Sequence, residues 1–328
     1  MKILITGGLG FIGSNLLDKL HRNISIKKII IIDNFSKTNL SNLSNNIRYK
    51  YYSSGKSYTR SRYRVEIIKA DISDHKLAIK LTRGIDYVVH LAAESGVELS
   101  INNPQEAFNI NVKSTFNYLE ASRINNIKRF LFASSCAVFG DIEPPHHEEL
   151  PRKPISPYGS SKLSIESFCE TYNNIFKLNT TILRFSNVYG NHSIHKNSVI
   201  SKFVKNILNN KAITINGDGK ITRDYIHVED ICNAIYKCMK LKKSMQVYHV
   251  ATGKETTLNI LVFMIKKIFK KYNKNNILVK HTNERIGDMK KNYSIVSKIE
   301  KEANWKSKIS LHRGLDETIK WYLTELNR

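Results

Sequence analysis

The sequence predicts a doubly wound α/β fold, in which helices cover both faces of a parallel β-sheet and a smaller carboxyl-terminal cap follows. Three observations support this fold class. Short apolar, β-branched segments recur through the amino-terminal half, helix-like segments lie between most of them, and the first strand-like segment runs directly into a glycine-rich turn. A chain of 328 residues is long enough to bury such a core and to carry a cap.

Taken in order along the chain, the pattern predicts strands at residues 2–6, 28–32, 65–69, 87–91, 130–134 and 180–183. It predicts helices at residues 12–21, 109–122, 198–209 and 258–272. The rhythm becomes irregular beyond Asn187. We therefore expect residues 1–186 to form the main domain, residues 224–250 to return to it, and residues 187–328 to form mainly the cap.

Residues 36–64 interrupt the alternation of strands and helices, because they are rich in Asn, Ser, Tyr and basic side chains. Basic residues interleaved with tyrosines could stack on a nucleic acid strand. A solvated surface excursion is the simpler interpretation, and it is the one that we expect.

Composition limits the class of protein. Hydrophobic residues make up 41% of the chain, no apolar run approaches a membrane span, and the amino terminus lacks the pattern of a signal peptide. We expect a globular, cytoplasmic protein. The net charge of +24 suits an anionic partner, but lysine is abundant throughout the chain, so the excess is interpreted as a compositional bias. The four cysteines have no zinc-like spacing and predict reduced, buried thiols and no metal site.

The sequence TGGLGFIG at residues 6–13 follows the first predicted strand and precedes the first predicted helix. Glycines at 7, 10 and 13 permit a tight turn, close approach of a pyrophosphate, and packing of the helix on the strand. Asp33 ends the second predicted strand, twenty residues beyond Gly13. A carboxylate at that spacing can accept hydrogen bonds from an adenosine ribose and would repel a 2′-phosphate, so NAD is predicted rather than NADP.

Tyr158 and Lys162 lie four residues apart at the start of another helix-like segment and so share one face of it. A phenol, with an ordinary pKa of about 10, becomes a useful base near neutral pH only where positive charge stabilises its anion. Lys162 and an oxidised nicotinamide could both supply that charge. Taken alone, the pair is also compatible with two exposed helix side chains.

Together these motifs resemble the extended short-chain dehydrogenase/reductase family, the NAD-dependent nucleotide-sugar epimerases and dehydratases, over nearly the whole chain. The resemblance is carried by TGGLGFIG (6–13), Asp71-Ile72, HLAAESGV (90–97), SSCAVFG (134–140), Tyr158 with Lys162, RFSNVYG (184–190) and GDGKITRDYIHVEDI (217–231).

The resemblance implies a Rossmann fold, a homodimer and a set of site residues. The implied catalytic residues are Ser135, which hydrogen-bonds the sugar oxygen, Tyr158 and Lys162. The implied NAD-binding residues are Gly7, Gly10, Phe11, Ile12, Gly13, Asp33, Asn34, Asp71, Ile72, Leu91, Ala92 and Ala93, with Tyr158 and Lys162. The implied residues for the nucleotide sugar are Ser135, Asn187, Arg223, Arg285, Asp288 and Asn292.

Members of this family share the first step, in which the tyrosine removes the proton of the sugar 4-hydroxyl, and they differ afterwards. A 4,6-dehydratase places Asp-Glu after the catalytic hydroxyl residue, where this chain has Cys136 and Ala137. The 3,5-epimerase/reductases use a cysteine and a histidine at the positions of Cys136 and His192, so that branch stays open. A 4-epimerase needs neither group, and we expect that activity on a UDP-sugar.

Asn292 bears on the choice of sugar, because some galactose-type epimerases hold a bulky tyrosine at this position. The smaller side chain leaves room for a 2-acetamido group, so UDP-N-acetylglucosamine and its galacto epimer join UDP-glucose and UDP-galactose as expected substrates. The alternative of a different class is a nucleic-acid-binding protein on a dinucleotide fold. The presence of Ser135, Tyr158 and Lys162 disfavours it.

Overall fold

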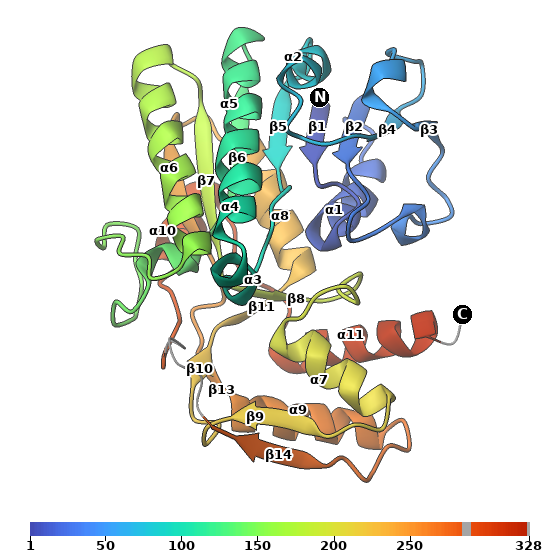
Figure 1. Ribbon diagram of the computed structural model, residues 1–328, viewed down its shortest axis with the longest axis vertical. Helices are drawn as coiled ribbons and strands as arrows, with labels where there is room; N and C mark the ends of the chain where they lie inside the picture. Colours follow the sequence, from blue (N-terminus) through green and yellow to red (C-terminus); the bar gives the residue numbers. More distant parts are fainter. Residues whose placement is uncertain (284–289, 327–328) are drawn as a thin grey trace.

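The computed structural model describes residues 1–283 and 290–326, and it is organised around an eight-stranded sheet (Figure 1). All neighbouring strands in this sheet are parallel. In spatial order the strands are β12 (Gln246–Val250), β7 (Thr180–Phe185), β6 (Arg129–Ser135), β5 (Tyr87–His90), β1 (Lys2–Thr6), β2 (Lys28–Asp33), β4 (Val65–Lys69) and β3 (Tyr49–Tyr52).

Helices cover both faces of this sheet, which confirms the predicted doubly wound fold class. One face carries α1 (Phe11–His21), α8 (Val228–Met239) and α10 (Ser297–Ala303). The other carries α2 (His75–Thr82), α5 (Thr115–Ile124) and α6 (Pro157–Phe176). Because both faces are covered, the central strands are buried along their length, and every residue of β2 is buried.

The predicted strands differ from the observed ones by no more than two residues at either end, and the four cysteines are free and buried as expected. The predicted helix at residues 109–122 is instead a π-helical turn, Asn109–Ser114, that runs into α5. It follows two short helices, α3 (Val97–Asn102) and α4 (Pro104–Phe108). Among the described residues, no helix combines the length and the apolar character needed to cross a membrane.

The smaller part lies below the carboxyl ends of the strands and has its own apolar core (Figure 1). Its helices are α7 (Val199–Leu208), α9 (Leu258–Lys270) and α11 (Leu311–Leu326). Its strands pair two by two: β9 (Ile213–Asn216) with β14 (Val279–Thr282), β10 (Thr222–Arg223) with β13 (Thr256–Thr257), and β8 (Asn187–Tyr189) with β11 (Tyr225–His227). The pairing of β8 with β11 joins the end of the large sheet to this part.

The expectation of a solvated excursion at residues 36–64 is wrong for its central segment. Residues 49–52 form β3 and extend the sheet beside β4, and the side chains of Tyr52 and Tyr58 are buried. The Tyr58 hydroxyl donates to Glu66 Oε2 at 3.1 Å, and Glu66 also pairs with Lys28 at 2.6 Å. The tyrosines therefore act as strand and core residues, because each ring packs on the sheet while its hydroxyl satisfies a polar partner.

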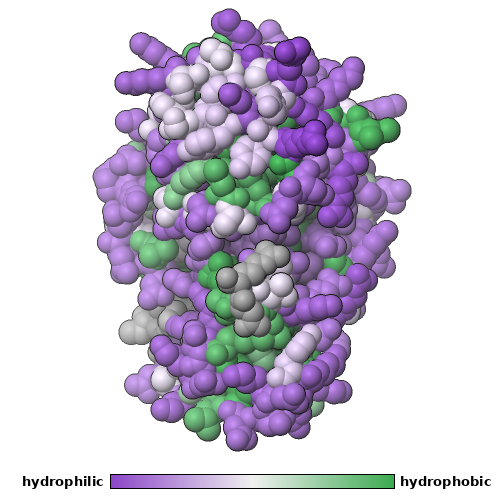
Figure 2. All heavy atoms as spheres, turned by 90° about the vertical axis from the view of Figure 1, so that its right-hand side faces the viewer, coloured by the Kyte–Doolittle hydropathy of each residue, from purple (hydrophilic) through white to green (hydrophobic). Residues whose placement is uncertain are grey.

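Figure 2 looks at the molecule from the side on which β3 and β4 lie. The face is mostly hydrophilic, and apolar side chains gather near its middle and in the lower half. The polar character of this side fits an edge of the sheet that is open to solvent.

Candidate active site

The glycine turn between β1 and α1 passes very close to the loop that follows β5. Gly7 has a φ of +66°, and a Cβ built on it would lie 2.8 Å from the backbone of Ala92. A Cβ on Gly13 would lie 2.4 Å from the carbonyl oxygen of Gly7. Side chains at these positions would push α1 and the β5 loop away from the turn, so both positions require glycine.

The amino terminus of α1 opens at this turn. Gly10 precedes the helix, and no described side chain caps it, so the backbone N–H groups of Phe11 and Ile12 remain available to a ligand. Free N–H groups and the positive end of the helix dipole together favour a phosphate. The turn thus fits the diphosphate of a dinucleotide cofactor.

Asp33 lies at the end of β2 beside the same turn, where its carboxylate accepts hydrogen bonds from the backbone N–H groups of Leu9 at 3.0 Å and Phe35 at 2.9 Å. Burial raises the pKa of Asp33, and these backbone donors act in the opposite direction. The side chain is therefore held in place at the cofactor edge, where ribose hydroxyls could donate to it.

Asn34 follows β2 and Asp71 follows β4, and Asn34 Nδ2 lies 3.4 Å from Asp71 Oδ2. Both line a cavity of about 420 Å³, whose other walls include residues 53–56. Sequence reasoning did not include residues 53–56 in the site, because it treated this segment as a solvated excursion. The cavity is in position to receive the adenosine end of a cofactor whose ribose lies at Asp33.

The remaining predicted cofactor residues lie along the other side of the turn. The backbone N–H of Leu91 donates to Thr6 O, and that of Ala92 donates to Thr6 Oγ1, both at 3.2 Å. Ala93 continues this loop in a half-buried position, and Ile72 is buried in the core next to Asp71. The structure thus brings the predicted cofactor residues to one edge of the sheet.

The three predicted catalytic residues come from β6 and α6. Ser135 ends β6, and its hydroxyl accepts a hydrogen bond from the Ala137 N–H at 3.2 Å. The Ser156 side chain caps α6 by accepting from the Gly159 N–H at 3.1 Å, which fixes the first turn where Tyr158 lies. One turn later Lys162 Nζ donates to Ala133 O at 2.8 Å and lies 5.8 Å from the centre of the Tyr158 ring.

The electrostatics of this group follow from its burial. Burial raises the pKa of Tyr158 to about 12, while a hydrogen bond with Ser135 acts in the opposite direction. Burial, assisted by the nearby Lys196 and opposed by Glu166, lowers the pKa of Lys162 to about 7. The phenol is thus protonated without ligands, and added positive charge or a hydrogen-bonded substrate would make its deprotonation easier.

A buried ion pair links α6 to β7, next to β6. Glu166 lies one turn after Lys162 on α6 and accepts two hydrogen bonds from Arg184 of β7, at 2.7 and 3.0 Å. It also accepts a hydrogen bond from the hydroxyl of Ser134. The helix and both strands are therefore tied together directly behind Ser135.

Asn111 is a structural contributor that sequence reasoning missed. It lies in the π-helical turn, where its Oδ1 accepts from the Glu94 N–H at 2.8 Å and its Nδ2 donates to Glu94 O at 3.0 Å. The same Nδ2 lies 3.1 Å from Ser161 Oγ of α6. A buried asparagine within a helix is an unfavourable choice unless its amide has partners, and this was the available signal.

Asn187, Arg223 and Asn292 lie near one another where the smaller part meets the sheet. The backbone and side-chain N–H groups of Asn187 both donate to Asp224 O, and the Asp224 N–H donates to Asn292 O at 2.9 Å. Asn292 is 5% exposed, and its Oδ1 is buried with no hydrogen-bond partner among the described residues. The other two predicted nucleotide-sugar residues, Arg285 and Asp288, lie outside the described residues.

Cys136 and His192, which the sequence left as a possible proton-transfer pair, have separate surroundings. Cys136 is 3% exposed and lies 3.7 Å from His249 Nδ1 and 3.5 Å from Ser294 Oγ. Burial raises the pKa of its thiol to about 12. His192 packs against Trp321, at 5.2 Å between ring centres.

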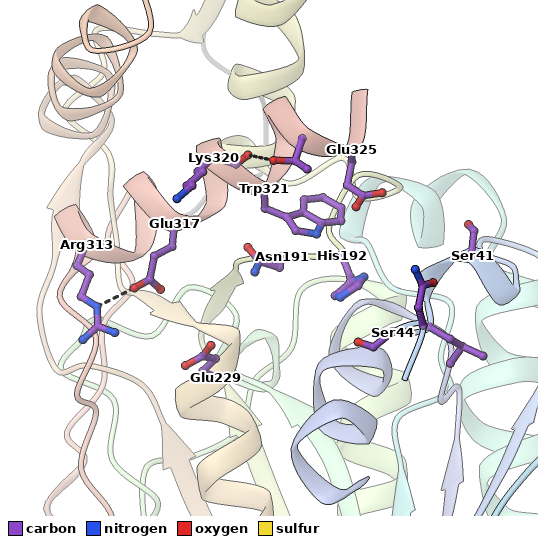
Figure 3. A pocket seen from close by; sticks show the side chains of 13 residues that line it. Ser41, Ser44, Asn191, His192, Glu229, Arg313, Glu317, Lys320, Trp321 and Glu325 are labelled. Carbon is purple, nitrogen blue, oxygen red and sulfur yellow. Dashed lines mark hydrogen bonds and ion pairs between the residues drawn. The ribbon is translucent and has the colours of Figure 1, made fainter. Parts of the chain in front are cut away.

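Figure 3 shows that His192 and Trp321 line a cavity of about 650 Å³, together with the ion pair of Arg313 and Glu317. None of Ser135, Tyr158 and Lys162 lines this cavity. The histidine therefore belongs to the boundary between α11 and the loop after β8, and not to the surroundings of Cys136.

The low pKa of Lys162 yields a stability prediction. Between about pH 7 and 10.5 the unfolded chain binds a proton that the folded chain has lost, so stability should rise with pH in this window. We expect Lys162→Met to remove this penalty and to raise the Tm of NAD-free protein by a few degrees at pH 7, as measured by calorimetry. Lys267→Met, on the exposed side of α9, is the control and should change Tm little. A Tm for the Lys162 variant below that of the parent would contradict this account.

Comparisons with known proteins agree with this geometry. A family model described as "NAD dependent epimerase/dehydratase family" matches residues 3–251. A Methanocaldococcus jannaschii protein named "Putative UDP-glucose 4-epimerase" is 36% identical over 97% of both chains. Human dTDP-D-glucose 4,6-dehydratase is 29% identical over 98% of this chain and 89% of its own.

Among solved structures, UDP-N-acetylglucosamine 4-epimerase from Methanobrevibacter ruminantium, in complex with UDP-N-acetylmuramic acid, superposes with a TM-score of 0.88. It is 32% identical, and the match covers 99% of this chain and 98% of that one. The chain therefore belongs to the NAD-dependent epimerase/dehydratase family, and its cofactor is NAD.

Proposed function

We propose that the protein is a 4-epimerase of a UDP-sugar, either UDP-N-acetylglucosamine and its galacto epimer or UDP-glucose and UDP-galactose. One observation carries the proposal: Ser135, Tyr158 and Lys162 lie together where β6 meets α6, while the positions after Ser135 hold a buried thiol and an alanine instead of carboxylic side chains. The same proposal assigns NAD to the glycine turn, Asp33, Asn34 and Asp71, and the nucleotide sugar to Asn187, Arg223 and Asn292.

In this mechanism Tyr158 removes the proton of the sugar 4-hydroxyl, and Lys162 favours the phenolate that must form beforehand. Ser135 donates a hydrogen bond to the sugar oxygen as negative charge develops on it. NAD held by the glycine turn and Asp33 would supply the hydride acceptor and donor for C4, with the 4-keto sugar turning over between the two transfers. Tyr158 then gives its proton back to the oxygen on the opposite face, so no further acid or base is needed.

The alternatives within the family require groups that are poorly placed here. A 4,6-dehydratase needs a carboxylic pair beside Ser135, where Cys136 and Ala137 stand. A 3,5-epimerase/reductase needs Cys136 and His192 to act on one sugar, but each lies among different neighbours and the thiol has a raised pKa. The non-enzymatic alternative, nucleic-acid binding, loses support because Tyr52 and Tyr58 are buried in the segment that suggested it.

The test of the function is turnover of a panel of UDP-sugars in D₂O. A 4-epimerase puts the sugar's own hydrogen back on C4, so mass spectrometry should find the epimer without carbon-bound deuterium. Dehydration or epimerisation at C3 or C5 exchanges a carbon-bound proton with solvent, and deuterium in the sugar ring would overturn the proposal. Cys136→Ala should retain a sizeable part of the activity.

Tyr158→Phe separates chemistry from cofactor binding. The variant should keep its NAD, because binding depends on the glycine turn and Asp33, and it should lose roughly 10²- to 10⁴-fold in kcat, the usual range for a general acid–base group. Absorbance of the purified protein measures the bound cofactor, and a coupled assay measures the rate. Equal loss of NAD and activity would contradict the separate roles.

The proposed acetamido preference rests on Asn292. Its Oδ1, which is buried with no hydrogen-bond partner in the part of the chain that the structure describes, could accept a hydrogen bond from the N–H of a 2-acetamido group. The M. ruminantium relative, whose name gives UDP-N-acetylglucosamine as its substrate, supports the same preference.

We therefore expect Asn292→Tyr to lower kcat/KM for UDP-N-acetylhexosamines while sparing UDP-hexoses. The added ring takes the space of the acetamido group, at a cost of roughly 1–3 kcal/mol. Steady-state kinetics with both sugar classes gives the ratio of the two specificity constants. Asn292→Ser is the matched small variant and should keep that ratio close to the parent value. A ratio unchanged by tyrosine would mean that the pocket wall lies elsewhere.

We also propose that two copies pair through α5 and α6, as a homodimer. Phe168, Ile175 and Phe176 are exposed on α6, and Phe116 and Tyr172 link the two helices through aromatic contacts. The exposed part of α6 between Lys162 and Lys177 carries no basic residue in a chain of net charge +24. Arg123 of α5 lies over the Phe176 ring, but Glu120 offsets its charge at 2.6 Å, so two copies can meet there with little repulsion between cations.

Light scattering after gel filtration should give a dimer for the parent and a monomer for Phe168→Glu, because a carboxylate would be buried in the interface. Phe263→Glu, at an exposed phenylalanine of α9, is the control and should leave the dimer intact. A monomeric parent protein would refute the dimer.

A further inference from the structure

Lys196 lies in the loop between β8 and α7, where its backbone is firmly held. Its N–H donates to Ser193 O at 2.9 Å, and its carbonyl oxygen accepts from Ser201 Oγ at 2.8 Å and Lys205 Nζ at 3.0 Å. Ser193 and Ser201 in turn both hydrogen-bond the Tyr322 hydroxyl of α11. The starting point of the Lys196 side chain is thus fixed by the core of the smaller part.

The side chain of Lys196 crosses from the smaller part to the loop that follows β5. Its Nζ donates to Ser95 Oγ at 2.6 Å. Ser95 is next to Glu94, whose backbone Asn111 holds on both sides and whose carboxylate pairs with Lys37 at 3.3 Å. Lys196 therefore bridges the two parts, between fixed points on both sides.

Positive charge is in excess around this crossing. Lys37 and Lys162 both lie close enough to Lys196 to interact with it electrostatically, and the acidic side chains nearby are Glu94, which pairs with Lys37, and Glu166, which pairs with Arg184. Burial lowers the pKa of Lys196, Glu94 acts in the opposite direction, and Lys37 lowers it again. An ammonium group has three donors, and Ser95 Oγ is the one side-chain acceptor that Lys196 Nζ reaches among the described residues.

An anionic oxygen group would resolve this imbalance. It would accept the hydrogen bonds that the neutral Ser95 hydroxyl cannot, and it would offset the repulsion between Lys196 and its two lysine neighbours. The glycine turn between β1 and α1 already fits the phosphates of the cofactor. The charge at Lys196 is thus available to a second anion.

We propose that Lys196 binds an anionic oxygen group of the nucleotide sugar, supplied by its diphosphate or by a carboxylate on the sugar ring. The inference rests on the proposed function, since it requires a nucleotide sugar to bind between the two parts, next to Lys196. Lys196 would be a binding residue that draws the smaller part onto the substrate, and Ser95 would hold its ammonium group in place before the substrate arrives.

The experiment compares the NAD-loaded parent with Lys196→Gln and Lys196→Arg by calorimetric titration. UDP against uridine measures the contribution of the diphosphate, and UDP-glucuronate against UDP-glucose measures that of a carboxylate. Lys196→Gln should reduce one of these two affinity ratios at least tenfold, and Lys196→Arg should restore most of it, because arginine retains the charge. Lys220→Gln, which removes an exposed lysine paired with Asp218, is the matched control and should change neither ratio.

The two arms also identify the source of the anion, since loss confined to the first ratio assigns the diphosphate and loss confined to the second assigns the carboxylate. Tm and NAD content of each variant verify that it is folded and loaded. Both ratios unchanged in Lys196→Gln would overturn the inference, whatever its NAD content. A parent protein that binds no UDP or UDP-sugar would instead refute the proposed function, so the two failures are distinguishable.

Discussion

The close approach of the β1–α1 turn to the loop after β5 is the constraint on which the site depends. Backbone contacts near Gly7 and Ala92 leave no space for a side chain, and this brings the helix amino terminus, Asp33 and the β5 loop to one edge of the sheet. Because all eight strands are parallel, the carboxyl ends of β6 and β7 reach that same edge with Ser135 and Asn187. The smaller part lies below this edge, on the side to which the carboxyl ends of the strands point.

Burial of charge distinguishes the catalytic region from the rest of the core. Glu166 and Arg184 neutralise each other behind β6, whereas Lys162 has a backbone carbonyl and aromatic rings around its ammonium group. The first arrangement leaves no uncompensated buried charge, and the second leaves a lysine that is poorly solvated. Burial of Lys162 therefore costs stability locally, at a residue to which the proposed function gives a role.

Periodicity and motif spacing predicted the parallel sheet, the glycine turn and the placement of Tyr158 one turn before Lys162, because each is a local property of the sequence. Sequence reasoning failed where the outcome depended on distant partners. Tyr58 can be buried because Glu66 accepts a hydrogen bond from its hydroxyl. Lys196 reaches Ser95 in the other part of the molecule, and no rule of sequence spacing predicts this contact. Asn111 carried a weak signal as an asparagine inside a helix, but its partner Glu94 comes from another loop.

The position of β12 at one end of the sheet has a consequence for the order in which the chain can fold. The chain leaves the sheet after β7, builds β8 to β11 with α7 and α8, and only then returns to pair β12 with β7. During synthesis, β7 would present an unpaired, apolar edge until residues 246–250 emerge, and such edges invite association between nascent chains. Completion of the large sheet is therefore late in translation, and the smaller part is not one continuous segment, because α8, β12 and α10 return to the large sheet between its elements.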